Sequence, residues 1–293
     1  LDCTNIIPVP EAAVITSIGL DHTAILGRTE AEIARSKCGI IKGGLAVAAA
    51  GIPESAMAVL RERCENVGVR LVVPDTSVLR LGKCGLSGSE FSYRGRDFCI
   101  SMCGGHQVGN AMTALEVLNN ISEGNIFAEN NNRSSAITYE NVYRGLSEAA
   151  MPARLEQFPP KRGRPYTVLD GGHNPQAMNA ARAVLESDPR KKTALIGMID
   201  TKDYESSLGI ILPCFERVFF VDGFAPNAVC AETLCTAGAR LGAECCAVHD
   251  IARGVSDAAE TAGRDGVLFI GGSLYMASEA RKILRGESEN ENA

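Results

Sequence analysis

The sequence predicts an α/β protein with two parallel-sheet domains. Short apolar runs alternate with longer amphipathic patterns, which is typical of β–α–β units around a mainly parallel sheet. The chain has 293 residues, of which 45% are hydrophobic, enough for about two domains at roughly 150 residues each. The Pro- and Arg-rich stretch "AAMPARLEQFPPKRGRP" separates two such series. We therefore place a domain boundary near residue 150.

The first domain, residues 1–150, opens with a strand at 12–20 and a helix at about 30–38. Thr29 and Glu32 have the spacing of a capping box, which marks the start of this helix. Further strands are predicted at "LAVAAAG" and "RLVVP", with a helix at about 54–66 between them.

The sequence pattern changes after Asp75, where short segments of alternating apolar and polar residues, such as "EFSYRGRDFCISM", predict antiparallel hairpins up to Gly105. A helix at about 107–121 and another at about 138–149 complete the domain. The stretch "SEGNIFAENNNRSS" between them is rich in Asn and Ser and predicts a surface loop.

The second domain, residues 151–286, repeats a strand–helix unit and predicts a complete doubly wound sheet. Asn174 and Pro175 fit the N-cap and first position of its first helix. The charged residues 287–293 have little to pack and predict a disordered tail. The strands are predicted near 166–170, 193–199, 217–222, 244–248 and 266–271, each followed by a helix.

Composition argues against several classes of function. The net charge is −6, basic residues are scattered and tryptophan is absent. The sequence therefore shows no stripe of basic and aromatic residues that would bind nucleic acid. No apolar run reaches the roughly 18 residues of a membrane helix, and no signal-peptide pattern is present. We expect a soluble, cytoplasmic protein that binds neither nucleic acid nor membranes.

The 11 cysteines lie mostly in apolar or helical runs and predict reduced, mostly buried thiols. The densest group contains five possible zinc ligands, but it lacks the paired C-x2-C spacing of a structural zinc site. These are Cys230, Cys235, Cys245, Cys246 and His249. We assign no function to His249.

Polar residues follow predicted strands at three points: Asp21-His22-Thr23, "DGGHNP" (170–175) and "GGSLY" (271–275). In open parallel sheets, ligands bind outside the carboxyl ends of strands, where helix N-termini point into the crevice. For any one of these turns, the alternative is that residues such as Asp170 and Asn174 only shape the turn. Three such turns in one chain weaken this alternative.

These turns occur within longer motifs that run in order along the chain: "ITSIGLDHTAILGRTEAEIARSKCGIIKGG", "GGHQVGNAMTAL", "MPARLEQF", "VLDGGHNPQA", "LIGMIDTKDY" and "FIGGSLYMASEARKIL". Together the motifs resemble the folylpolyglutamate synthase and bifunctional dihydrofolate synthase family of the Mur ligase superfamily. The resemblance implies that residues 1–150 are the C-terminal portion of the central ATP-binding domain, and that 151–286 are the Rossmann-like C-terminal ligase domain.

The resemblance implies an ATP-dependent amide ligase whose cofactors are ATP and Mg²⁺. In this chemistry a folate or dihydropteroate carboxylate takes the γ-phosphoryl group of ATP to become an acyl phosphate, and the amine of L-glutamate then displaces phosphate. The partners are small-molecule substrates, and the full-length protein is expected to be a monomer.

The magnesium site implied by the resemblance contains His22 of "LDHT" and Lys37 of "SKCGI". Carbamylation of Lys37 by CO₂ would turn its amine into a carboxylate that supports the metal. Without the resemblance, Lys37 is simply a cation favoured by the helix dipole at a helix C-terminus.

The resemblance also assigns residues of the second domain. Arg154 of "PARLE" matches the family's arginine that reaches nucleotide phosphates across the domain interface, where a guanidinium suits a transferred phosphoryl group. Asp170 and His173 match the pair at the nucleotide and the incoming glutamate, and with Lys37 they are the expected catalytic residues. Ser273 matches a residue near the glutamate site.

The "HQVGN" segment of the first domain matches the family's motif that borders the adenine pocket, which assigns Gln107 and Asn110 to the nucleotide. His106 is open to two interpretations, a helix cap or a nucleotide contact.

The chain departs from the family at its beginning. Family members carry a P-loop of the form G-T-N-G-K-G-S and a metal-binding Glu upstream of "LDATN", whereas this chain opens at "LDCTN". No G-x-x-x-x-G-K-[ST] motif occurs elsewhere in the chain. Since P-loop amides and lysine hold the β- and γ-phosphates, we expect a fragment that does not hydrolyse ATP by itself.

Three alternatives remain open. A nicotinamide-dependent oxidoreductase would need G-x-G-x-x-G directly after a strand, and "IGGSLY" lacks the third glycine. A non-catalytic remnant of the family would keep the fold without the reaction. A peptidoglycan-type Mur ligase is the nearest competitor among ligases. The acceptor, dihydropteroate or a folate polyglutamate, is not fixed by these motifs.

Overall fold

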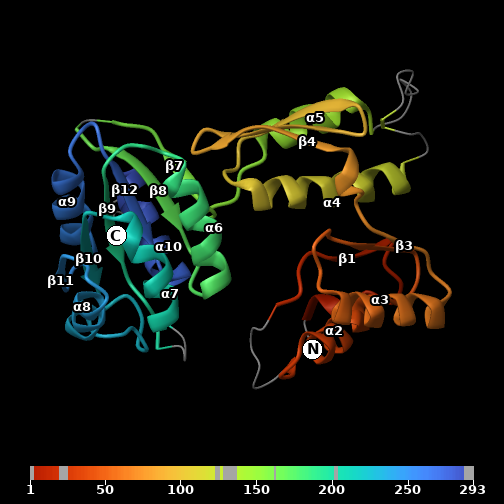
Figure 1. The fold of residues 1–293 in the computed structure, drawn as a ribbon, viewed down its shortest axis with the longest axis horizontal. Coiled ribbons are helices and arrows are strands. Elements are labelled where there is room, and N and C mark those ends of the chain that lie inside the picture. Colours follow the sequence, from red (N-terminus) through yellow and green to blue (C-terminus); the bar gives the residue numbers. More distant parts are fainter. Residues whose placement is uncertain are drawn as a thin grey trace, which may run out of the picture. The chain divides into compact units, whose positions relative to one another are not determined.

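The computed structural model describes residues 3–19, 26–122, 126–127, 137–161, 163–200 and 204–286. The chain forms two compact units. Figure 1 shows the chain coloured along the sequence, from red at the N-terminus through green to blue at the C-terminus. The first unit contains residues 1–83, 90–100 and 105–148, and the second contains 84–89, 101–104 and 149–293. Within the described residues, no helix has both the length and the apolar character needed to cross a membrane.

One layer of the first unit is a three-stranded parallel sheet in the order β1-β2-β3. Its apolar side chains pack with two helices in a core that includes Ile15, Ile33, Ile41 and Leu60. A short 3₁₀ helix, Cys3–Ile6, precedes the sheet. The elements are β1 (Ala12–Ile15), α2 (Glu30–Lys37), β2 (Leu45–Ala48), α3 (Glu54–Val67) and β3 (Leu71–Val72).

The capping box predicted at the start of α2 is confirmed. The Thr29 side chain accepts a hydrogen bond from the backbone N–H of Glu32, and the Glu32 carboxylate accepts one from the backbone N–H of Thr29, both at 3.3 Å. These two bonds satisfy donors that a helix start leaves unpaired. They fix the point from which α2 runs to Lys37.

The hairpin region predicted after Asp75 forms a three-stranded sheet in the order β4-β5-β6. Two-residue turns join its strands, and the second turn has left-handed φ at both Arg94 (50°) and Gly95 (77°), as in a type I′ hairpin. Helices α4 and α5 pack with β5 and β6 around buried aromatic rings such as Tyr93. The elements are β4 (Leu79–Gly85), β5 (Gly88–Tyr93), β6 (Arg96–Ile100), α4 (Gly105–Ile121) and α5 (Tyr139–Glu148).

The second unit contains a six-stranded sheet in the order β11-β10-β9-β12-β8-β7, and all neighbours are parallel except β7 and β8. The α/β class and the five predicted strands are confirmed. The antiparallel edge strand β7 (Glu156–Phe158) is an addition that the sequence pattern did not indicate. The other elements are β8 (Tyr166–Asp170), α6 (Pro175–Glu186), β9 (Lys192–Ile196), α7 (Tyr204–Ile211), β10 (Arg217–Val221), α8 (Ala231–Arg240), β11 (Cys245–Val248), α9 (Ile251–Ala262), β12 (Val267–Gly271) and α10 (Leu274–Arg285).

Successive residues of the central strands belong to two separate cores. Val168 and Phe269 pack with α6, α7 and α8 on one face of the sheet. Leu169 and Leu268 pack with α9 and α10 on the other face. This alternation follows from the period of two in strand side chains, and coverage on both faces explains the almost continuous apolar sequence of these strands.

Two short segments of the second unit interrupt the first unit in sequence. Leu86, in the β4–β5 turn, and Cys103 lie in the same core as Val168. The Tyr166 hydroxyl donates to the carbonyl oxygen of Leu86 at 3.1 Å, and Gln157 Nε2 donates to that of Ser101 at 3.1 Å. Residues distant in sequence therefore help to build the second sheet's core.

Two expectations need correction. The strand predicted at 12–20 ends at Ile15, because residues 16–19 have no strand partners although Ile18 is buried. The cysteines were expected to be mostly buried, but among those described only Cys38, Cys64 and Cys103 are buried. Cys84 and Cys230 are exposed, and the other five are of intermediate burial. The described cysteines are free thiols, as expected.

Candidate active site

Two of the predicted site turns emerge side by side in the second unit. Strand β8 ends at Asp170 and its neighbour β12 ends at Gly271, and these two residues are paired in the sheet register. Asn174 caps α6 by accepting from the N–H of Ala177 at 2.9 Å, as predicted. Ser273 caps α10. Two helix N-termini therefore begin directly beyond adjacent strand ends, where their free amides favour anions.

Asp170 anchors both the turn that follows it and a distant turn. Its carboxylate oxygens accept hydrogen bonds from the N–H of Gly172 at 2.7 Å and from the N–H of Leu155 at 2.8 Å. Burial raises the pKa of Asp170 above its ordinary value, while the two N–H bonds and the Arg154 guanidinium lower it in part. These two hydrogen bonds are therefore contacts expected of a residue that shapes the turn.

Arg154 lies at the tip of a strained turn. Its neighbours Ala153 and Leu155 both have left-handed φ, at 53° and 47°, a conformation that costs non-glycine residues of the order of 1 kcal/mol or more. Both neighbours are buried, whereas Arg154 is exposed. The turn thus holds two apolar side chains in the core and projects the guanidinium outward beside Asp170.

Glu156 holds the other side of this turn. Its carboxylate accepts from the N–H of Ala153 at 3.0 Å, and Arg281 Nε approaches its two oxygens at 3.0 and 2.8 Å. Burial acts to raise the pKa of Glu156, but the Arg281 and Ala153 hydrogen bonds and the Arg281 and Arg285 charges outweigh it, so the pKa is lowered. Two carboxylates, Asp170 and Glu156, therefore clamp the Arg154 turn.

The turn after β12 depends on a glycine. Gly272 has φ +105°, and a Cβ atom there would lie 2.7 Å from the carbonyl oxygen of Gly197. This close approach allows the β12 turn to pack against the end of β9 before α10 begins.

The remaining predicted residues of the second unit have different surroundings. His173 is half-buried in the turn between Asp170 and the start of α6. Ser273 is only 1% exposed, and its Oγ accepts from the N–H of Tyr275 at 3.3 Å. The hydroxyl of Ser273 thus has a local capping contact, and its predicted place near glutamate stays a prediction.

Lys37 lines a cavity of about 410 Å³ in the first unit. The side chain is exposed, and its Nζ donates to the carbonyl oxygen of Ser17 at 3.3 Å. Other lining residues include Asn5, Thr16 and Ser36. The cavity lies at the carboxyl end of β1, and the metal role that the resemblance implies for Lys37 stays a prediction. His22 lies outside the described residues.

Asn110 lines a second cavity, of about 490 Å³, between β1 and α4. Most of its wall is apolar, and it shares Val14 and Thr16 with the cavity of Lys37. Gln107 is buried, and its Oε1 accepts from Asn110 Nδ2 at 2.9 Å, which orients the Asn110 amide. The structure thus brings Lys37 and the "HQVGN" segment to two adjoining cavities at the end of one strand.

Sequence reasoning missed the support of the Arg154 turn. Arg281 lies 125 residues from Glu156, and although each belongs to one of the quoted motifs, nothing in either motif indicates that the two side chains pair. The strained φ angles at Ala153 and Leu155 leave no signal either, since neither is a glycine.

No protein-family profile matches the chain. Among curated proteins, the chain is similar to the folylpolyglutamate synthase of Lacticaseibacillus casei, with 28% identity over 305 residues, covering 97% of this chain and 64% of the relative. It is also similar to the dihydrofolate synthase/folylpolyglutamate synthase of Bacillus subtilis, with 27% identity over 292 residues, covering 97% and 65%.

A solved structure of Mycobacterium tuberculosis folylpolyglutamate synthase complexed with ADP and AMPPCP matches with a TM-score of 0.79 at 24% identity, covering 97% of this chain and 65% of that one. The chain therefore spans less than two thirds of these relatives' length. The matched proteins are consistently folylpolyglutamate or dihydrofolate synthases. The resemblance and the Mur-ligase-like fold predicted from the motifs are confirmed.

Proposed function

Because the chain is related to the folylpolyglutamate and dihydrofolate synthases, we propose that it forms part of an ATP-dependent amide ligase that adds L-glutamate to a folate or dihydropteroate carboxylate. The γ-phosphoryl group of ATP passes to that carboxylate to give an acyl phosphate, and the glutamate amine then displaces phosphate. One observation supports this proposal above others: the strained turn that projects Arg154 is clamped by Asp170 and Glu156.

In this proposal Arg154 binds the phosphate groups of the nucleotide. A guanidinium offers several N–H donors in a fixed plane and stabilises charge on a transferred phosphoryl group. Asp170 keeps Arg154 in place through the Leu155 N–H, and its negative charge orients the guanidinium. His173 and Ser273 lie at adjacent strand ends, where they would contact the incoming glutamate.

The first unit would contribute the metal and the adenine contacts. Lys37 and His22 are proposed to hold Mg²⁺, with Lys37 carbamylated so that it provides a carboxylate. Hard oxygen donors suit Mg²⁺, and the Lys37 cavity offers them in Asn5, Thr16 and Ser17. The ion would neutralise phosphate charge. Gln107 and Asn110 would border the adenine beside the largely apolar second cavity.

The 293 residues by themselves contain no P-loop, so we propose that this polypeptide alone does not turn over ATP. The test compares it with the product of the open reading frame that contains it. We expect glutamate-dependent ADP release only from a polypeptide that includes a P-loop. Turnover by the purified 293-residue chain would contradict this part of the proposal.

The role of Arg154 is tested in the active polypeptide. Arg154→Ala should lower kcat/KM for ATP by roughly a hundredfold or more, in the range found for removal of one donor to a reacting oxyanion. The matched control is Arg253→Ala, which removes an exposed arginine of the same unit. Assays with dihydropteroate and with a folate as acceptor identify the substrate. Wild-type kinetics for Arg154→Ala would refute the assignment.

A further inference from the structure

A second group of side chains lies at the carboxyl edge of the same sheet, on strands that the proposed active site does not use. Asp222 follows β10, His249 follows β11, and Glu232 lies in the first turn of α8. In the strand order, β10 is three positions from β8. At roughly 4.8 Å per strand, the group lies about 14 Å from Asp170 along the sheet.

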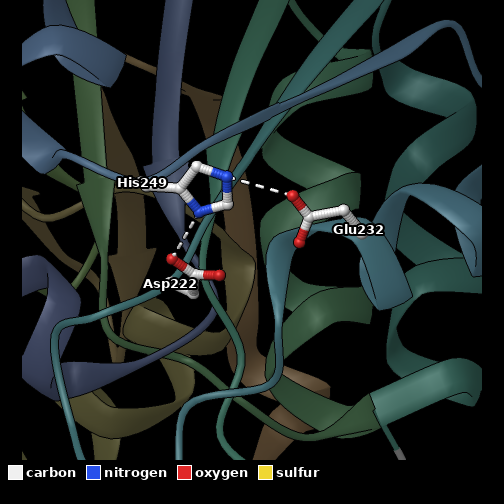
Figure 2. A group of neighbouring side chains, drawn as sticks. All are labelled: Asp222, Glu232 and His249. Carbon is white, nitrogen blue, oxygen red and sulfur yellow. Dashed lines mark hydrogen bonds and ion pairs between the residues drawn. The ribbon is translucent and has the colours of Figure 1, made fainter.

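The three side chains converge although they come from three elements. His249 Nδ1 is 3.1 Å from Asp222 Oδ1, and His249 Nε2 is 3.0 Å from Glu232 Oε1. Figure 2 shows the imidazole between the two carboxylates, with one nitrogen facing each. One ligand atom from each residue lies within 4.8 Å of the other two.

Each carboxylate has one oxygen anchored elsewhere and the other directed at the imidazole. Asp222 Oδ2 accepts from the backbone N–H of Ala231 at 2.9 Å. Glu232 Oε2 accepts from the thiol of Cys230 at 2.7 Å. Such outer contacts fix the orientation of metal ligands in proteins. The oxygens that remain, Asp222 Oδ1 and Glu232 Oε1, are the ones nearest to His249.

The charge of the group favours a cation, and solvent can reach it. In the described part of the chain, the ion pairs of Asp222 and Glu232 are with His249, not with a lysine or arginine. The side chains of His249 and Glu232 are 63% and 59% exposed, while Asp222 is 19% exposed. A hydrated ion can therefore enter without opening the fold.

The donor atoms select the class of ion. An imidazole nitrogen with two carboxylate oxygens suits Zn²⁺ and similar transition metals, whereas Mg²⁺ and Ca²⁺ prefer oxygen alone. A metal ion binds one nitrogen of an imidazole, and bonds of about 2.1 Å in tetrahedral geometry place neighbouring donors about 3.4 Å apart. His249 Nδ1 and Asp222 Oδ1, at 3.1 Å, are already close to that separation. Glu232 Oε1 faces the other ring nitrogen, so it is the donor that has to move, and its exposed side chain has room to do so.

We propose that Asp222, Glu232 and His249 form a binding site for a divalent transition-metal ion such as Zn²⁺ or Co²⁺. This site is separate from the magnesium site of the proposed ligase reaction, and it does not depend on that reaction. Water molecules would complete the coordination, since the protein supplies three ligands.

The test titrates the metal-free 293-residue chain with Zn²⁺ by calorimetry and with Co²⁺ by visible absorption. We expect the wild type to bind one equivalent more than His249→Gln. Comparing stoichiometries between these two proteins removes any contribution from histidines elsewhere. Equal stoichiometry and affinity in wild type and His249→Gln would overturn the proposal.

Two further variants separate ligation from general attraction to negative charge. Glu232→Gln changes an exposed side chain and should weaken binding by about tenfold or more. Glu216→Gln is the matched control, since it removes one exposed carboxylate of the same unit that pairs with Lys191. Glu216→Gln should bind as tightly as the wild type. If both variants weaken binding equally, the ion responds only to net charge and the proposal fails.

Discussion

Replacing Asp170 by alanine tests whether this carboxylate holds the Arg154 turn. The substitution removes the acceptor of two backbone donors, Leu155 N–H at 2.8 Å and Gly172 N–H at 2.7 Å. Asp170 is only 7% exposed, so water does not readily take its place. The left-handed φ of Leu155 would then be maintained by fewer contacts.

The expected loss follows from the number of buried donors. A buried donor left without a partner costs about 1–3 kcal/mol, so two donors give about 2–6 kcal/mol for Asp170→Ala. Asp170→Asn retains one acceptor oxygen and should lose about 1–3 kcal/mol, since its NH₂ group faces the other donor. Removing a buried charge offsets part of both losses, because burial already raises the pKa of Asp170.

The assay is urea unfolding of the 293-residue chain together with hydrogen exchange of the amides at Leu155 and Gly172. We expect both amides to exchange faster in Asp170→Ala, and the Leu155 amide to identify the Arg154 turn. Asp265→Ala, at an exposed position of the same unit, should change stability by less than about 0.5 kcal/mol. Unchanged exchange at Leu155 in Asp170→Ala would refute the view that Asp170 holds this turn.

Three further predictions concern other contacts. Glu156→Gln should be less stable than wild type at neutral pH. The difference in stability should fade below pH 4.5, the ordinary pKa of a glutamate, because a carboxylate with a lowered pKa loses its stabilising effect when it is protonated. Thermal melts of both proteins across this pH range measure the difference. Thr29→Ala should cost about 1 kcal/mol by loss of the capping box, and increased exchange in the first turn of α2 would locate the effect. Gly272→Ala should destabilise the chain by more than about 1 kcal/mol in urea unfolding, because residue 272 has a left-handed φ and the new Cβ would lie 2.7 Å from a carbonyl oxygen. A variant as stable as the wild type would contradict the described turn.

Features determined by a few neighbouring residues were predictable from the sequence. The Thr29 capping box and the Asn174–Pro175 helix start follow from side chains within three positions of the atoms they bind. The five parallel strands of the second unit were visible because a strand covered on both faces is almost wholly apolar. The proposed chemistry of the site came from the family resemblance of the motifs, and the roles of the individual residues stay predictions.

Features that depend on distant residues were not predictable. Strand β7 has only three residues, and it is a strand because it pairs with β8. The clamp on Arg154 joins Glu156 to Arg281 across 125 residues, and the group around His249 requires β10, α8 and β11 to be folded. None of these arrangements has a characteristic spacing. They arise from the order of strands in the sheet, which periodicity alone does not reveal.

The strand order has a consequence for how the second unit is completed during synthesis on the ribosome. Among the six strands of this sheet, β12 comes last in the sequence, yet it lies between β8 and β9. Until residue 271 has left the exit tunnel, β8 with β7 and β9 with β10 and β11 are two half-sheets with no shared neighbour. A chain that stopped before β12 would therefore leave the facing edges of β8 and β9 unpaired.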